Sequence, residues 1–95
     1  MNEIGYEERR ETYGEALQRF GPEHQMNKFD EELGEFLTEW GRMRNGEGDI
    51  EKMAEEMADL TIMLEQLRMI FNVNEKVCGY MDQKILRLQK RLEGQ

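Results

Sequence analysis

The acidic residues of this 95-residue chain gather at helical spacing in two segments. Glu31, Glu32 and Glu35 lie in the first segment, and Glu56 and Asp59 lie in the second, with 20 residues between Glu35 and Glu56. Residues three or four apart on a helix are surface neighbours, and like charges there repel by about a few tenths of a kcal/mol per pair. Because carboxylates repel each other in both segments, we expect a cation to bind between the two segments. Carboxylate oxygens without His or Cys are typical ligands of Mg²⁺ or Mn²⁺, although acidic helices also show such spacings by chance.

Helix-forming residues dominate the chain and predict an all-α fold. Leu, Met, Glu, Gln, Lys and Arg favour helices, and Pro22 is the only proline. Apolar residues recur at steps of three and four between short segments of turn residues. We therefore predict a single domain, 1–95, with helices at about 6–20, 23–44, 50–71 and 75–92. The short connections favour antiparallel neighbours, which places the two acidic groups at similar heights, about 15–18 Å from the turn between the second and third helices.

The predicted third helix is apolar on two sides. Its main stripe contains seven residues at helical spacing, which are Ile50, Met53, Met57, Leu60, Leu64, Leu67 and Phe71. Ala58, Ile62 and Met69 fall on the opposite side at 100° per residue. A second copy of the protein would cover that side most economically, so we predict a four-helix, hairpin-type bundle completed by dimerisation or tetramerisation. The alternative is that these apolar residues are simply exposed, as is common on protein surfaces.

The composition argues against several classes of protein. The chain has 21 Asp and Glu residues against 13 Lys and Arg, so its net charge is −8. This charge argues against nucleic-acid binding, which depends on neutralising phosphates. The chain lacks the run of about 20 apolar residues of a transmembrane helix, and residues 1–10 lack the apolar region of a signal peptide. Cys78 is the only cysteine, which suits a reducing compartment, so we expect a cytoplasmic protein that binds neither nucleic acid nor membrane.

The two acidic segments together resemble a family signature. Glu31-Glu32-x-x-Glu35, followed after 20 residues by Glu56-x-x-Asp59, is similar to the paired motifs of the MazG-like all-α nucleoside triphosphate pyrophosphohydrolases. The resemblance extends over three segments, 25–40, 55–67 and 84–91. It implies a Mg²⁺-dependent enzyme that hydrolyses a nucleoside triphosphate to the monophosphate and pyrophosphate. It also implies a helical bundle shared by two or four copies.

The same resemblance implies roles for the acidic residues. Four of them are implied as metal ligands, namely Glu32, Glu35, Glu56 and Asp59. Glu31 is implied either as a further ligand or as the base that orients the attacking water. A divalent ion in this site would offset the repulsion between five carboxylates and a triphosphate.

Basic residues near the end of the chain are candidates for phosphate binding. Lys84 and Arg91 match the family pattern Lys-x-x-x-Asn-x-x-Arg, with Leu88 at the Asn position. The alternative is a solvated basic face near a helix C-terminus. Gln25 and Lys28 are further candidates for the substrate pocket. The alternative functions are hydrolysis of another nucleotide, such as dUTP, dCTP or a modified nucleotide, and a non-catalytic acidic helical oligomer that acts as a scaffold or regulatory partner.

Overall fold

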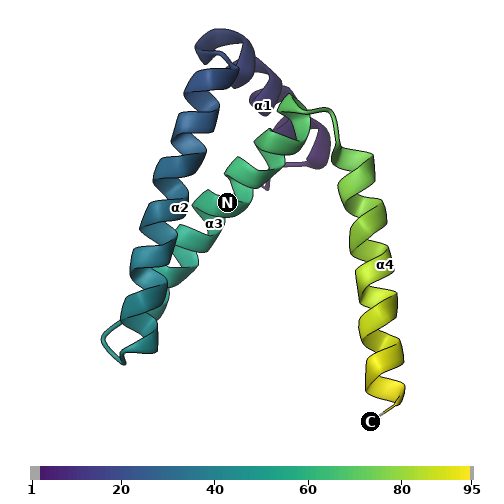
Figure 1. Cartoon of the computed structure of the whole chain (residues 1–95). Coiled ribbons are helices and arrows are strands. Elements are labelled where there is room, and N and C mark those ends of the chain that lie inside the picture. Colours follow the sequence, from purple (N-terminus) through teal and green to yellow (C-terminus); the bar gives the residue numbers. More distant parts are fainter. Residues whose placement is uncertain (1–2, 95) are drawn as a thin grey trace.

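The computed structural model describes residues 3–94 and contains four helices (Figure 1). They are α1 (Tyr6–Phe20), α2 (Pro22–Arg44), α3 (Ile50–Ile70) and α4 (Asn74–Glu93). No strand occurs in residues 3–94, so the predicted all-α class is confirmed. Each helix corresponds to a predicted one, with ends that differ by at most one residue. Within the described part of the chain, no helix has the length and apolar character needed to span a membrane.

Local chemistry sets the ends of α2 and α3. Pro22 occupies the first turn of α2. Backbone N–H groups in this turn have no hydrogen-bond partner within the helix, so the lack of an N–H in proline breaks no helical hydrogen bond. Gly21 before it has a φ of 87°, and Gly46 in the turn between α2 and α3 has a φ of 76°. Both values lie in the region that favours glycine. Asp49 caps α3, because its carboxylate accepts a hydrogen bond of 3.0 Å from the backbone N–H of Glu51.

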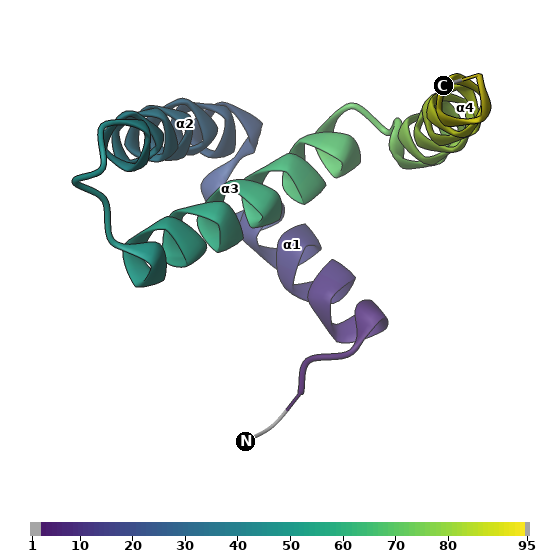
Figure 2. The ribbon, with the colours of Figure 1, turned by 90° about the horizontal axis from the view of Figure 1, so that it is seen from below.

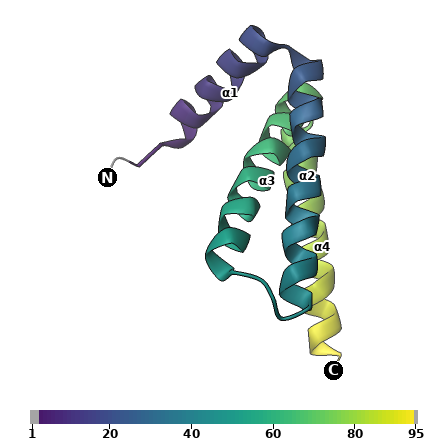
Figure 3. The same ribbon diagram turned by 90° about the vertical axis from the view of Figure 1, so that its left-hand side faces the viewer.

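The antiparallel pair of α2 and α3 is the main packing unit of the chain (Figures 2 and 3). Met53 and Met63 of α3 are buried in it, with 2% and 5% of their surface exposed. The amide of Gln25 on α2 donates a hydrogen bond to the amide oxygen of Gln66 on α3, and both side chains are buried. This hairpin carries both acidic segments and fixes their relative height.

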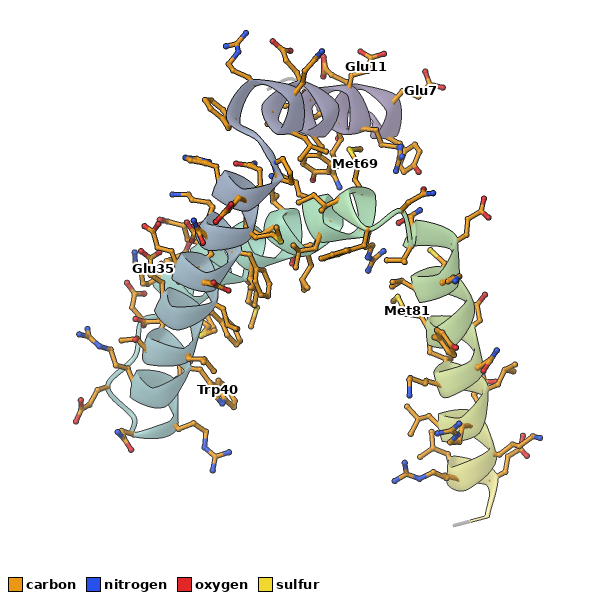
Figure 4. All side chains as sticks on the ribbon, turned by 45° about the horizontal axis from the view of Figure 1, so that its top comes forward. Glu7, Glu11, Glu35, Trp40, Met69 and Met81 are labelled. Atoms are coloured by element: carbon orange, nitrogen blue, oxygen red, sulfur yellow. The ribbon has the colours of Figure 1, made fainter. Side chains whose placement is uncertain are left out.

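α1 packs against α2 and α3, and Tyr13 is its one buried residue. The hydroxyl of Tyr13 donates a hydrogen bond to Glu65 on α3. Ala58 and Ile62 line a groove of about 500 Å³ beside Tyr13, and the side chain of Met69 points towards α1 (Figure 4). The second apolar side of α3 therefore faces α1 of the same chain, but Ala58 and Ile62 remain exposed there.

α4 lies apart from the other helices. It diverges from the hairpin in Figure 1, and among residues 3–94 it contacts α3 only. None of residues 74–93 is buried. Met57 and Leu64 of α3 and Phe71 directly after it belong to the predicted core stripe but are 49%, 44% and 60% exposed. A single chain therefore packs three helices together and leaves apolar surface on α3 and α4 uncovered.

Candidate metal centre

Three carboxylates from two helices meet on one side of the α2–α3 hairpin. Glu32 and Glu35 come from α2, and Glu56 comes from α3. One oxygen of each lies within 4.8 Å of the others. A second group with the same spacing consists of Glu55, Glu56 and Asp59. Glu56 belongs to both groups, so it is the centre of the acidic cluster.

The two buried carboxylates are only half satisfied. The side chains of Glu32 and Glu56 are 10% and 3% exposed. Lys28 Nζ lies 3.5 Å from Glu32 Oε1, and Lys52 Nζ lies 3.0 Å from Glu56 Oε1. In the described part of the chain, Oε2 of Glu32 and Oε2 of Glu56 are buried without a hydrogen-bond partner. A buried charged oxygen without a partner is costly, so these two atoms mark a place that suits a cation.

The negative charge of the cluster shifts the pKa of its exposed members. The charge of Glu32 raises the pKa of Glu35 above its usual value, and partial burial and the charge of Glu56 add to this effect. The hydrogen bond and charge of Glu56 raise the pKa of Lys52, and the charge of Glu55 contributes further. Both shifts have the same origin, which is an excess of negative charge between the helices. A divalent cation would relieve it.

A groove of about 590 Å³ opens over the cluster. Its walls include Glu31, Glu35 and Glu56 together with two basic side chains, Arg42 and Lys52. In Figure 4, Glu35 and Trp40 project from opposite sides of α2. The acidic groove therefore occupies one side of the hairpin, and the exposed Trp40 belongs to the other side.

Three members of the site, Glu39, Arg42 and Lys52, were not expected from the sequence. Glu39 is buried, lines the groove and accepts a hydrogen bond of 3.3 Å from the backbone N–H of Asp49. Gln25, Glu32 and Glu39 are seven residues apart and form the buried polar side of α2. Arg42 lies on the groove wall. The position of Lys52 four residues before Glu56 is the signal that could have identified it.

The predicted ligands fall into different environments. Glu32, Glu35 and Glu56 meet in one group, whereas Asp59 is half-buried and belongs to the group of Glu55 and Glu56. Glu31 is exposed and lines the groove; its carboxylate lies 3.9 Å from Lys28 Nζ.

The predicted substrate-binding residues are dispersed. Lys28 lies at the cluster as the partner of Glu32. Gln25 is buried between α2 and α3, where it bonds to Gln66 and does not line the groove. Lys84 and Arg91 are exposed on α4, which within one chain does not contact α2. A single chain therefore does not bring these two cations to the carboxylates.

No family model, curated protein or solved structure matches this chain. The resemblance to MazG-like enzymes therefore rests on the acidic motifs and stays a prediction. The geometry of the α2–α3 groove is the basis for a functional proposal.

Proposed function

We propose that the α2–α3 groove binds a divalent cation, Mg²⁺ or Mn²⁺, and that the protein is a nucleotide pyrophosphohydrolase. The proposed reaction converts a nucleoside triphosphate to the monophosphate and pyrophosphate. The observation that carries the proposal is the pair of buried carboxylate oxygens without a partner, Oε2 of Glu32 and Oε2 of Glu56. The donor set consists of carboxylate oxygens, which suits hard cations such as Mg²⁺.

The residues of the groove have distinct proposed roles. Glu32, Glu35 and Glu56 would hold the cation, with Asp59 at the edge of the cluster as a further ligand. A bound divalent cation supplies positive charge that offsets the repulsion of a triphosphate and polarises its phosphoryl oxygens. Glu31 is exposed at the groove and would accept a proton from the attacking water.

Two cations on the groove wall suit phosphate binding. Arg42 and Lys52 both line it, and a guanidinium can bind two phosphate oxygens at once. The volume of about 590 Å³ falls within the usual range of small-ligand pockets. Lys28 would hold the carboxylates of Glu31 and Glu32 in place.

The proposal also includes self-association, as a dimer or tetramer, and a cytoplasmic location. The exposed single cysteine, Cys78, supports a reducing compartment. A second candidate function is a non-catalytic helical oligomer that serves as a scaffold or regulatory partner. The observation that favours it is the amount of apolar surface left exposed on α3 and α4.

The test is a product analysis over a panel of nucleoside and deoxynucleoside triphosphates with Mg²⁺ or Mn²⁺. The proposal expects equal amounts of monophosphate and pyrophosphate from at least one of them. Glu56→Gln should abolish the activity, and Glu11→Gln, on the exposed surface of α1, is the matched control. Diphosphate and orthophosphate as products would indicate a phosphatase instead. No hydrolysis of any nucleotide would leave the oligomer as the better candidate.

A further inference from the structure

The single chain exposes too much surface for a compact domain of its size. Its accessible surface is 7933 Å², whereas a compact monomer of 11.4 kDa exposes about 5,800 Å². Its radius of gyration is 16.4 Å, against about 12.4 Å for a compact 95-residue domain. The excess is roughly 2,000 Å² per chain. An obligate dimer commonly buries 2,000–5,000 Å² in total over its two partners, so this excess is sufficient for one.

Two apolar surfaces contribute to this openness. The first, the hairpin surface, lies on the side of α2 and α3 away from the acidic groove and consists of Leu37, Trp40, Met57, Leu64 and Phe71. The second, the α4 stripe, consists of Val77, Met81, Ile85, Leu88 and Leu92. Trp40 and Met81 project from α2 and α4 towards the space between these helices (Figure 4). In the single chain both surfaces remain largely exposed.

The two surfaces match in length and composition. The α4 stripe spans 15 residue steps, or about 23 Å, and Met57 to Phe71 on α3 spans 14 steps, or about 21 Å. At 100° per residue, the five stripe residues fall within an arc of about 80°. This arc makes one apolar side of α4, somewhat narrower than the width of about 100° typical of a helix face that packs on a core.

The two segments that carry these surfaces have opposite net charges. Residues 74–93 contain five Lys and Arg and three Asp and Glu, which gives +2. Residues 22–70 contain five Lys and Arg and thirteen Asp and Glu, which gives −8. Lys84 and Arg91 border the α4 stripe, so they would lie at the rim of any interface that the stripe forms. The opposite net charges of the two segments favour the approach of α4 to the hairpin of a second copy.

We infer that α4 of each copy packs on the hairpin surface of a second copy, in a reciprocal interface that covers both apolar surfaces at once. Such an exchange is the two-fold arrangement in which the same patch serves both partners. The connection 71–73 is short and contains Asn72 with a φ of 55°, which directs α4 away from its own hairpin. The proposed interface rests on the self-association that is part of the proposed function. It does not depend on the proposed metal binding or nucleotide hydrolysis.

Light scattering tests the inference with two matched variants of α4. The parent at micromolar concentration should have at least twice the mass of 11.4 kDa. Leu88→Glu, in the centre of the stripe, should give a monomer. Leu86→Glu places the same charge on the opposite side of α4, where Leu86 is 58% exposed, and should keep the mass of the parent. A parent that is monomeric, or a Leu88→Glu protein with the mass of the parent, overturns the interface.

The single tryptophan gives a second readout that does not require the variants to fold. Trp40 is 45% exposed in one chain and would be covered in the assembly, so its emission should shift to the red as the parent is diluted to monomer. A blue-shifted emission at monomer mass means that α4 folds onto its own hairpin, which overturns the exchange. The nucleotide assay is independent of this result. An assembly without hydrolysis removes only the proposed reaction, and a monomer that releases pyrophosphate removes only the interface.

Discussion

The ammonium of Lys52 lies 3.0 Å from one carboxylate oxygen of Glu56, and the other oxygen of the same carboxylate is buried without a hydrogen-bond partner. The two residues are four apart on α3, so one turn of helix holds them together. Lys52 thus compensates part of the charge on Glu56, and the second oxygen is left without a partner. The same half-satisfied arrangement occurs at Glu32 with Lys28 on α2.

Mg²⁺ should raise the melting temperature of the parent protein. A cation that binds only the folded state stabilises it in proportion to the logarithm of its concentration. Glu56→Gln should remove most of this shift, because Glu56 belongs to both groups of carboxylates. Differential scanning fluorimetry over a Mg²⁺ series measures the effect, with Glu11→Gln as the control. An equal response of parent and Glu56→Gln would place any metal site elsewhere.

Glu35→Gln should stabilise the metal-free protein at neutral pH. The charge of Glu32 raises the pKa of Glu35 in the folded state, so between the usual and the raised value the folded protein binds more protons than the unfolded chain. The free energy of unfolding therefore falls as pH rises through this window, and the cost persists at neutral pH. Removing the charge removes the cost. Urea unfolding measures the free energy of unfolding from pH 4 to pH 8. This free energy should decrease less for Glu35→Gln than for the parent, and an equal decrease would contradict this account.

The pairing of the acidic segments could be predicted from the sequence, because helical spacing and a short turn fix which positions of α2 and α3 share a height. Glu32, Glu35 and Glu56 do meet. The burial of Glu39 could not be predicted, since it depends on where the turn returns the chain and brings the N–H of Asp49 within 3.3 Å of that carboxylate. Local spacing carries no information about such a contact.

The position of α4 also could not be predicted from the sequence. Its apolar stripe predicts that one face is covered, but a stripe does not specify the surface that covers it. The direction of α4 is set by the conformation of residues 71–73, including the left-handed Asn72. The placement of Lys84 and Arg91 away from the carboxylates of the same chain follows from that turn.

Stability at high pH should depend on Tyr13. Burial raises the pKa of Tyr13 to about 12, and its hydrogen bond to Glu65 adds to this effect. Between pH 10 and 12 the unfolded chain loses the phenolic proton and the folded protein keeps it, so the free energy of unfolding falls as pH rises. The stability advantage of the parent over Tyr13→Phe should therefore shrink across this range. Denaturant unfolding at pH 9 and pH 11.5 measures it, with Tyr80→Phe, an exposed site, as the control for loss of a hydroxyl.

Asp59→Asn should separate catalysis from folding. Asp59 is half-buried and lies within 4.8 Å of Glu55 and Glu56 by its nearest carboxylate oxygens, but it is not a member of the group around Glu32. Loss of its charge should leave the helix content unchanged and relieve repulsion of about a few tenths of a kcal/mol per pair in the metal-free protein.

Activity should respond to Asp59→Asn in the opposite direction. Loss of one anionic ligand at the edge of the cluster weakens the hold on the cation, and nucleotide hydrolysis should fall by about 100-fold or more, the scale seen when one well-placed charge-stabilising group is removed. Circular dichroism, a metal-free melting curve and a pyrophosphate assay on the same preparation decide the point, with Asp82→Asn on α4 as the control. A folded Asp59→Asn protein that keeps most of its activity would remove Asp59 from the site, because the two groups of carboxylates would then act independently and only the group of Glu32, Glu35 and Glu56 would matter for hydrolysis.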